Sequence, residues 1–240
     1  MARNTHFRFK QFTVHQDRCV MKVCTDACVF GSWVEYQSSQ RILDIGTGTG
    51  LLSLMAAQQN PTARIDAIEI DEAAASQAAE NCAQSPFADR ISVVFNSVQE
   101  HSPPYLYDLI ITNPPFFQED LRSPSSQKNR AHHAEYLSFT DLLLSVRRLL
   151  KDDGRWAVLL PPDESKVVVN KALGQGWRVV NELTLYHDFT KSPLRRMTTF
   201  AFGTERNKIT LSSEIAIFES DGTTYTVAFR KLLQEFYLIF

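Results

Sequence analysis

Two short segments of this sequence contain residues whose types and spacing are suited to binding a ligand and reacting with it. The first is the glycine turn Asp44-Ile45-Gly46-Thr47-Gly48-Thr49-Gly50, which follows a β-rich run. Glycine has no Cβ atom, so backbone N–H groups in such a turn can approach a ligand closely. The turn ends a predicted strand and begins a predicted helix, which is where open α/β sheets bind nucleotide-like ligands.

The spacing of this turn distinguishes between ligands. Dinucleotide-binding folds have G-x-G-x-x-G, whereas this chain has G-x-G-x-G with the acid Asp44 two residues before it. A pyrophosphate prefers bare N–H groups, but an acid beside the turn suits an ammonium or sulfonium group. Glu69 ends the next predicted strand and is placed to accept hydrogen bonds from both hydroxyls of a ribose. We predict an S-adenosylmethionine site, with NAD-type binding and a merely tight turn as alternatives.

The second segment is Asn113-Pro114-Pro115-Phe116, which directly follows a buried run. Proline ends the strand because it donates no ladder hydrogen bond. An exocyclic amine on a heteroaromatic ring is a poor nucleophile, since its lone pair is delocalised. The Asn113 side-chain oxygen and the Pro114 carbonyl can each accept one of its N–H bonds and favour the pyramidal, more nucleophilic geometry. Phe116 offers a flat face for stacking. The alternative is a rigid turn beside a core phenylalanine.

Elements that alternate along the chain would position these segments. Short β-rich runs are predicted at residues 41–45, 64–70, 91–95, 107–112 and 155–160, and helices at residues 51–59, 139–150 and 164–173. Candidate helix N-caps are Asp71, Ser138 or Thr140, and Thr226, and residues 152–154 read as a turn. Two further strands are predicted at residues 177–186 and 197–202, and a short one at residues 215–218. Strands alternating with helices predict a Rossmann-like α/β fold with helices on both faces.

Composition bounds the class of protein. The 240 residues have 44% hydrophobic residues and a formal net charge of -2, which excludes collagen, disorder and a disulfide-built mini-protein. The chain has no apolar run long enough for a transmembrane helix, and its first residues have no apolar core of the signal-peptide type. The four cysteines lack zinc-site spacing. We expect a reduced, cytoplasmic, soluble protein without a metal.

The charge is uneven along the chain. Residues 1–24 and 191–208 each have a local net charge of +4, and residues 122–133 contain three cations and no acid. Such clusters are typical of a surface that binds a polyanion, although ordinary solvated faces explain them as well. We expect a single domain over residues 1–240, with an extension at 1–39, a long polar loop at 117–135 and an appendage at 207–240.

The two motifs resemble those of the class I S-adenosylmethionine-dependent methyltransferases of the amino type. D-x-G-x-G-x-G, the strand-terminal acid and N-P-P-F match in order. The resemblance implies a seven-stranded, mostly parallel sheet whose last strand is antiparallel. The segments 12–26, 31–33 and 236–238 are similar to the bacterial tRNA1(Val) (adenosine-37) N6-methyltransferase family. This narrower resemblance implies N6-methylation of an adenosine in tRNA, with tRNA as partner, and we expect a monomer.

The resemblance also implies roles for residues. The cofactor would be held by Thr25, Asp26, Asp44, Gly46, Thr47, Gly48, Gly50, Glu69, Asn96, Ser97 and Asn113. The target adenine would be held by Asn113, Pro114, Pro115 and Phe116. RNA contacts are expected from Arg18, Lys22, Arg130, Lys191, Arg195 and Arg196. The sequence departs from the family pattern at Cys24 and Ala27, where glycine is usual, and at Ser97, where an acid is common.

Other functions remain open from the residues alone. The same chemistry suits an exocyclic amine in rRNA or DNA, or a glutamine amide in a protein, although tyrosine is usual at Phe116 in the protein-modifying enzymes. A non-catalytic RNA-binding module is disfavoured by the intact Asn113-Pro114-Pro115-Phe116 turn. An NAD-dependent oxidoreductase is disfavoured by the spacing of the glycines.

Overall fold

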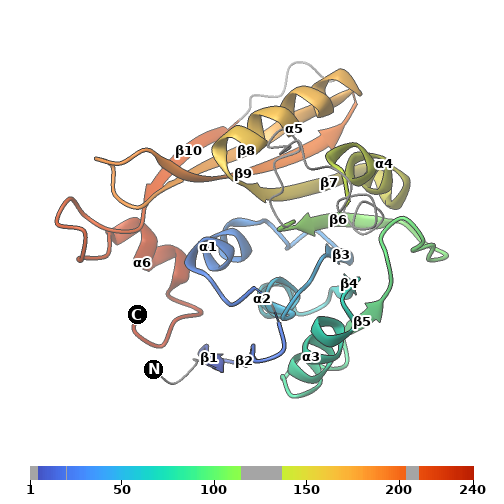
Figure 1. The fold of residues 1–240 in the computed structure, drawn as a ribbon, viewed down its shortest axis with the longest axis horizontal. Coiled ribbons are helices and arrows are strands. Elements are labelled where there is room, and N and C mark those ends of the chain that lie inside the picture. Colours follow the sequence, from blue (N-terminus) through green and yellow to red (C-terminus); the bar gives the residue numbers. More distant parts are fainter. Residues whose placement is uncertain (1–4, 20, 115–136, 204–210) are drawn as a thin grey trace, which may run out of the picture.

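The computed structural model describes residues 5–19, 21–114, 137–203 and 211–240. Within these ranges strands and helices alternate through the middle of the chain (Figure 1). The first half contains β1 (His6–Arg8), β2 (Thr13–His15), α1 (Thr25–Trp33), β3 (Arg41–Ile45), α2 (Leu51–Gln59), β4 (Arg64–Glu69), α3 (Glu72–Ala83), β5 (Ile91–Phe95) and β6 (Tyr107–Thr112). The second half contains α4 (Phe139–Leu149), β7 (Leu150–Leu160), α5 (Pro162–Gly174), β8 (Trp177–Tyr186), β9 (Pro193–Phe202), β10 (Leu211–Ala216) and α6 (Val227–Leu233).

The large sheet has the strand order β10-β8-β9-β7-β6-β3-β4-β5. The strands β3 to β7 pair in parallel, whereas β9 is antiparallel to both β7 and β8. The predicted Rossmann-like sheet with an antiparallel last strand is therefore confirmed. The predicted count of seven is one short, because β10 adds an eighth strand parallel to the edge strand β8. The short strand expected at 215–218 begins earlier, since its backbone pairs with that edge.

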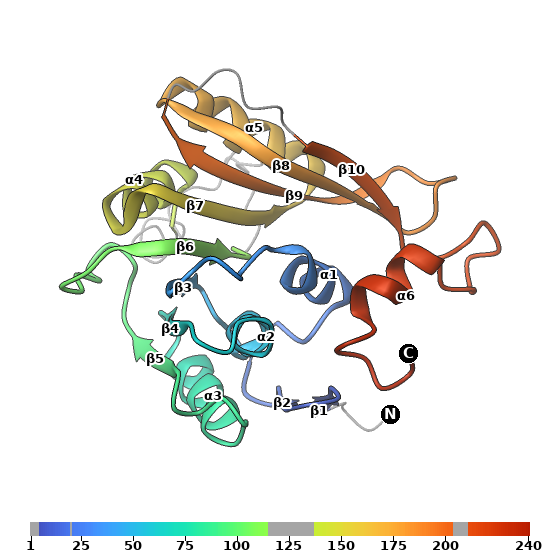
Figure 2. The same ribbon diagram turned by 180° about the vertical axis from the view of Figure 1, so that it is seen from behind.

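Helices cover both faces of the sheet, as Figure 2 shows from behind. Successive residues of a strand point to opposite faces, so the central strands supply two separate cores. On one face Ile42 and Leu109 pack with residues of α1, α2 and α6. On the other face Leu43 and Ile110 pack with residues of α4 and α5. Runs such as Ile42-Leu43 are apolar on both faces because parallel strands of this kind are buried on both sides.

Side-chain caps begin three of the helices where the sequence predicts them. Asp71 accepts a hydrogen bond from the Ala74 N–H at 2.7 Å at the start of α3. Ser138, rather than Thr140, caps α4 through the Asp141 N–H at 3.1 Å. A third cap, Thr226, begins α6. Because α3 follows β4 directly, its cap also fixes the chain just after Glu69.

Strand β7 differs from the sequence prediction. It begins at Leu150 rather than at Arg155, and the expected turn at residues 152–154 lies inside it. The pairing shifts from Tyr107–Leu150 to Leu109–Arg155, so four residues of β7 lie opposite Asp108 alone. The Lys151 ammonium lies 2.5 Å from the Asp108 carboxylate across this bulge. The glycine and aspartates therefore mark a bulge in a continuous strand, as such residues often do.

The two ends of the described chain pack against each other. Phe9 forms an isolated antiparallel bridge with Tyr237, and the Lys10 ammonium donates to the carbonyl of Phe240 at 2.8 Å. Helix α6 packs on α1 through the same cluster. The N-terminal and C-terminal segments thereby support α1, whose first residues belong to the predicted cofactor site.

Candidate active site

The glycine turn between β3 and α2 has the backbone conformation that its glycines allow. Gly46, Gly48 and Gly50 have φ angles of 70°, 55° and 82°, in the left-handed region that disfavours other residues. The N–H groups of Gly46 and Thr47 both donate to the Ile68 carbonyl, at 2.9 and 3.0 Å. A Cβ atom built on Gly46 or Gly48 would meet nothing within 4 Å. The turn is therefore fixed to β4 and leaves free space beside two of its glycines.

Asp44 is a buried carboxylate directly below this turn. Its Oδ2 accepts hydrogen bonds from Thr47 Oγ1 at 2.6 Å and from Ser53 Oγ at 2.8 Å. Its Oδ1 is buried and has no hydrogen-bond partner among the described residues. Burial raises the pKa of the Asp44 carboxyl to about 6, although the two hydroxyl groups act against this. Leaving such an oxygen unpaired costs free energy that a cationic or hydrogen-bond-donating ligand would recover.

Ser53 was not predicted as part of this site. It lies in the first turn of α2, so its hydroxyl returns toward the end of β3 and donates to the Asp44 carboxylate. A serine three residues after the last glycine of such a turn is the signal that could have identified it. Its hydroxyl helps to keep one oxygen of Asp44 occupied while the other remains unpaired.

Glu69, at the end of β4, is fixed by three backbone N–H groups. Gly48 donates to its Oε2 at 2.8 Å, and Ile70 and Asp71 donate to its Oε1 at 2.9 and 3.1 Å. The carboxylate is mostly buried and faces the glycine turn. Asn96, after β5, joins the same edge because its N–H donates to the Glu69 carbonyl at 3.0 Å. Ser97 follows it, with its own N–H bonded to Asn96 Oδ1.

Asn113 lies beside the glycine turn because of the register between β3 and β6. Ile45 pairs with Thr112, and the Thr112 hydroxyl donates to the Ile45 carbonyl at 2.9 Å. The next residue, Asn113, has a buried Oδ1 atom without a hydrogen-bond partner among the described residues. Pro114 is buried and follows it. The ends of β3 and β6 therefore bring together two acceptor oxygens, Asp44 Oδ1 and Asn113 Oδ1, that are buried and unpaired within the described chain.

Some predicted site residues lie outside the described ranges. They are Pro115, Phe116 and the whole polar loop at 117–135, which includes Arg130. The roles given to them from the sequence stay predictions.

Thr25 and Asp26 are the first residues of α1, and an ion pair fixes Asp26. The Arg195 guanidinium Nε lies 2.8 Å from Asp26 Oδ2, and both side chains are largely buried. Tyr237 of the C-terminal segment packs in the same hydrophobic cluster as Ala27 and Cys28 of α1. Arg195 was predicted to contact RNA, but the structure places its guanidinium against α1. Sequence pattern does not predict this pair, which joins positions 169 residues apart.

The remaining basic residues predicted to contact RNA have different surroundings. The Arg18 guanidinium forms an ion pair with Glu80 of α3, and Arg196 lies 3.6 Å from Glu182. Lys22 and Lys191 are exposed. Lys191 lies in the turn between β8 and β9.

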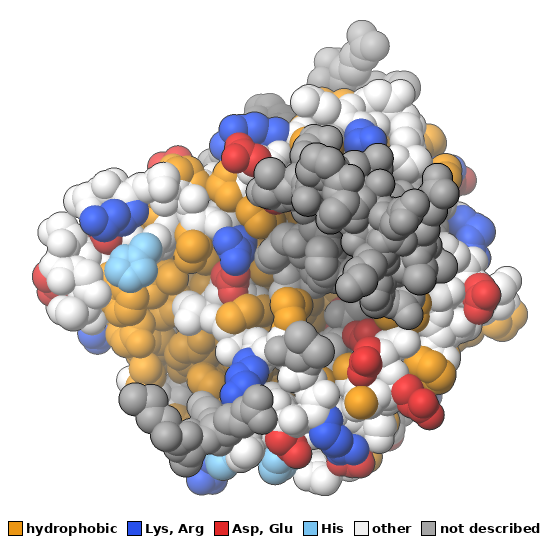
Figure 3. Space-filling model, in the orientation of Figure 1, with side chains coloured by type: hydrophobic (Ala, Val, Ile, Leu, Met, Phe, Trp, Pro, Cys, Tyr) orange, Lys and Arg blue, Asp and Glu red, His pale blue; other side chains and the backbone are white. Residues whose placement is uncertain are grey.

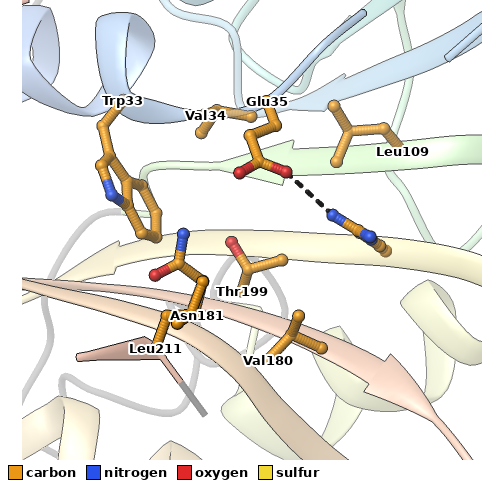
Figure 4. A pocket seen from close by; sticks show the side chains of 9 residues that line it. Trp33, Val34, Glu35, Leu109, Val180, Asn181, Thr199 and Leu211 are labelled. Carbon is orange, nitrogen blue, oxygen red and sulfur yellow. Dashed lines mark hydrogen bonds and ion pairs between the residues drawn. The ribbon is translucent and has the colours of Figure 1, made fainter. Parts of the chain in front are cut away.

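One cavity lies away from these residues. Figure 4 shows it between the end of α1 and the sheet, with a volume of about 140 Å³. Trp33, Leu109 and Asn181 line it, and Arg155 forms an ion pair with Glu35 across it at 3.0 Å. Its strand residues precede the strand ends where Asp44 and Asn113 lie, so it is a separate feature.

Two features are absent from the described residues. None of their helices combines the length and apolar character required to span a bilayer. They contain no group of three or more histidine, cysteine, aspartate or glutamate side chains placed to hold a metal ion.

Known proteins are similar to this chain in sequence and in fold. The profile of the methyltransferase small domain family matches residues 25–182. A protein of Dyadobacter fermentans named tRNA1(Val) (adenine(37)-N6)-methyltransferase is 51% identical over 240 residues, which is 100% of both chains. A protein of the same name from Bacteroides thetaiotaomicron is 40% identical, with 98% of each chain covered. A solved structure from Agrobacterium tumefaciens, described as a predicted O-methyltransferase, has a TM-score of 0.67 at 16% identity and covers 88% of this chain and 96% of its own.

The mostly parallel sheet with its antiparallel strand β9, together with the glycine turn after β3, defines a Rossmann-like methyltransferase. The chain belongs to the methyltransferase small domain family and, within it, to the family of the tRNA1(Val) (adenine(37)-N6)-methyltransferases. The solved structure shares the fold.

Proposed function

We propose that this enzyme transfers a methyl group from S-adenosylmethionine to the exocyclic N6 amino group of adenosine 37 in tRNA1(Val). The observation that supports it best is the buried Oδ1 of Asn113 beside the glycine turn, which has no hydrogen-bond partner in the described part of the chain. The names of the relatives supply the nucleotide and the tRNA. A cytoplasmic site of action follows from a tRNA substrate and is part of this proposal.

The residues of the glycine turn fit S-adenosylmethionine. A buried carboxylate oxygen of Asp44 lacks a partner among the described residues, which suits the ammonium group of the methionine part. The space beside Gly46 and Gly48 admits a ligand to the backbone. Glu69 faces the same turn and is placed to hold the ribose hydroxyls. We assign Thr25, Asp26, Asn96 and Ser97 to the rest of this pocket.

Asn113 and the Pro114 carbonyl hold the target amine in the proposed mechanism. When bound, S-adenosylmethionine supplies an electrophilic methyl group on a sulfonium sulfur. Asn113 Oδ1 accepts one N–H of the amine and the Pro114 carbonyl accepts the other, which directs the nitrogen lone pair out of the plane of the ring. These acceptors are fixed before the reaction by the end of β6, so they need no reorganisation. The N6 lone pair would form its bond to the methyl carbon as the carbon–sulfur bond breaks, leaving the thioether S-adenosylhomocysteine. The surplus N6 proton then passes to water, so no side chain must remove it beforehand.

Labelled S-adenosylmethionine distinguishes the substrate classes. The enzyme is incubated with unmodified tRNA, rRNA, DNA and protein fractions, and each fraction is counted and hydrolysed for nucleoside or amino-acid analysis. We expect label in tRNA as N6-methyladenosine. Label confined to rRNA, DNA or glutamine would contradict the proposed substrate while keeping the chemistry.

A further inference from the structure

The turn between β8 and β9, residues 187–192, stands at the edge of the sheet where the active site lies. Strand β9 runs antiparallel to its neighbours, so its first residues lie at the carboxyl ends of the parallel strands. Thr112 of β6 pairs with Val158, which pairs with Thr198 of β9. The hairpin continues five residues further, to Pro193. The turn therefore projects past the end of β6, as Figure 1 shows at the left of the view.

Strand geometry gives the separation between this turn and Asn113. Five residues of strand span about 17 Å, and the two strand spacings from β6 to β9 add about 10 Å sideways. The base of the turn is thus roughly 20 Å from the end of β6. The Arg195–Asp26 ion pair fixes this part of the hairpin to α1 at the predicted cofactor site. A single-stranded substrate whose target base lies at Asn113 would reach the turn with a nearby nucleotide.

Phe189 is the unusual residue of this turn because it is an aromatic side chain with 62% exposure. Its ring lies 5.3 Å from the ring of Tyr186, measured between centroids, and faces solvent on its other side. Exposing a large apolar ring to water has a free-energy cost, whereas the polar residues around it are well solvated. A partner surface that covers the ring would recover this cost.

The turn holds Phe189 in place without a ligand. Asp188 is buried, and its Oδ1 accepts hydrogen bonds from both the N–H and the hydroxyl of Thr190. Its Oδ2 lies 3.1 Å from the His187 ring nitrogen, and its carbonyl accepts from the Lys191 N–H at 3.1 Å. These bonds fix the backbone of the turn on both sides of Phe189. A partner that binds the Phe189 ring would therefore lose little conformational entropy in ordering the turn.

The charges of the turn favour an anionic partner. The Lys191 ammonium is exposed two residues after Phe189, and His187 is half-exposed. The acid of the turn, Asp188, is directed inward and hydrogen-bonded. Of the neighbouring acids, Glu214 accepts from the Tyr186 hydroxyl at 3.0 Å and Glu182 faces Arg196. An aromatic ring beside an exposed cation is the combination that binds a base together with its phosphate.

We propose that Phe189 stacks on an unpaired tRNA base near the target adenosine, while Lys191 contacts the adjoining phosphate. This inference rests on the proposed tRNA substrate and adds the residue that binds the RNA beside the reacting base. Stacking adds affinity without reading sequence, because every base has a flat face. Phe189 thereby affects how tightly tRNA binds and leaves the chemical step unchanged.

Three variants of Phe189 test this proposal in the full chain. Phe189→Ala removes the ring, Phe189→Leu keeps an apolar side chain without a ring, and Phe189→Trp keeps a stacking surface. We expect the KM for tRNA to rise about 5- to 100-fold in the alanine and leucine variants and to stay within about threefold in the tryptophan variant. The kcat and the Kd for S-adenosylmethionine should not change in any of them. Val227→Ala, which trims another exposed apolar residue on α6, is the matched control and should behave like wild type.

The outcomes separate the possible explanations. An unchanged KM for tRNA in Phe189→Ala, or a leucine variant as good as the tryptophan variant, would overturn stacking. A leucine variant that equals wild type while alanine fails would indicate a non-aromatic apolar contact with the tRNA instead of stacking. A wild-type enzyme that methylates no tRNA would refute the proposed function itself, a result distinct from methylation that is insensitive to Phe189.

Discussion

The fold raises the pKa of Asp44, a carboxylic acid in the predicted cofactor site. Its folded pKa of about 6 lies above the value of 3.8 for an unperturbed aspartate, because burial disfavours the charged form. Between these pH values the folded state binds more protons than the unfolded state. Asp44 therefore stabilises the ligand-free fold below about pH 4, and this contribution is lost as pH rises through about 6. A cationic ligand reverses the balance, because it favours the carboxylate.

The first prediction concerns the pH dependence of cofactor binding. We expect the Kd for S-adenosylmethionine to fall as pH rises from 5 to 7, with the change centred near the pKa of about 6. Asp44→Asn should weaken binding about 10- to 100-fold at pH 7.5, as expected for the loss of a charged hydrogen bond, and should remove most of the pH dependence. Calorimetric titration at several pH values measures both.

A matched control is Asp163→Asn, which removes an exposed carboxylate that pairs with Lys166 on α5. It should bind the cofactor like wild type at every pH. Equal affinity of wild type and Asp44→Asn at pH 7.5 would show that Asp44 does not contact the ligand.

The second prediction concerns the role of Asn113 in the reaction. Asn113→Ala should lower kcat about 10²- to 10³-fold, the range found when one preorganised hydrogen-bonding group is removed from an active site. The Kd for S-adenosylmethionine should stay within about threefold, since the glycine turn and Glu69 remain in place. Asn181→Ala, which changes an asparagine lining the separate cavity, should leave kcat unchanged. Turnover of Asn113→Ala close to wild type would rule out the assigned role.

At the scale of elements, the packing of α1 on α2 positions both halves of the predicted cofactor site. Gly31 of α1 faces α2, where a Cβ atom would lie 2.6 Å from Met55 Sδ and 3.1 Å from Leu52 Cδ2. Met55 is fully buried and has little room to move. The small residue therefore sets how closely the two helices approach.

The third prediction compares two glycines that lie in helices. Gly31→Ala gains helix propensity but crowds the buried Met55, so we expect the free energy of unfolding to fall by about 1–2 kcal/mol. Gly174→Ala, at the end of α5, meets nothing within 4 Å and should raise it by up to about 1 kcal/mol. Urea denaturation of both variants measures the difference. Equal effects of the two substitutions would mean that close approach of α1 and α2 does not require glycine.

The elements that the sequence predicted well are those defined by local pattern. The runs of β3 and β6, the glycine turn and the cap at Asp71 each depend on residues close together in the chain. The predictions that were wrong depend on distant pairing. The Asp152-Asp153-Gly154 turn became a bulge because Leu150 and Arg155, on either side of it, pair with β6 and Lys151 forms an ion pair with Asp108. Strand β10 formed because the edge of β8 offers unpaired backbone groups.

The predictions for the site also succeeded where they depended on local pattern or strand order and failed where they depended on contacts between distant residues. Asp44, Glu69 and Asn113 could be placed at one edge from strand order alone, since parallel strands end together. The unpaired Oδ1 of Asp44, its bond with Ser53 and the Arg195–Asp26 pair depend on side-chain geometry across elements, which sequence spacing does not give.

For the whole molecule, Figure 3 shows an apolar surface patch that bears on the expected monomer. Hydrophobic side chains gather over α6 and the C-terminal segment, where Val227, Leu238 and Ile239 are 80%, 59% and 67% exposed. A monomer is expected of a chain whose surface has no apolar patch, and this patch removes that reason. The monomer stays a prediction, which the mass from light scattering tests.

Methylation of a single nucleotide in a single tRNA is the sharpest test of the proposed function. An unmodified transcript of tRNA1(Val) and a second transcript with guanosine in place of adenosine 37 are each incubated with the enzyme and labelled S-adenosylmethionine. We expect close to one methyl group per tRNA in the first transcript, recovered as N6-methyladenosine, and none above background in the second. Equal incorporation into both transcripts, or label recovered as any other nucleoside, would contradict it.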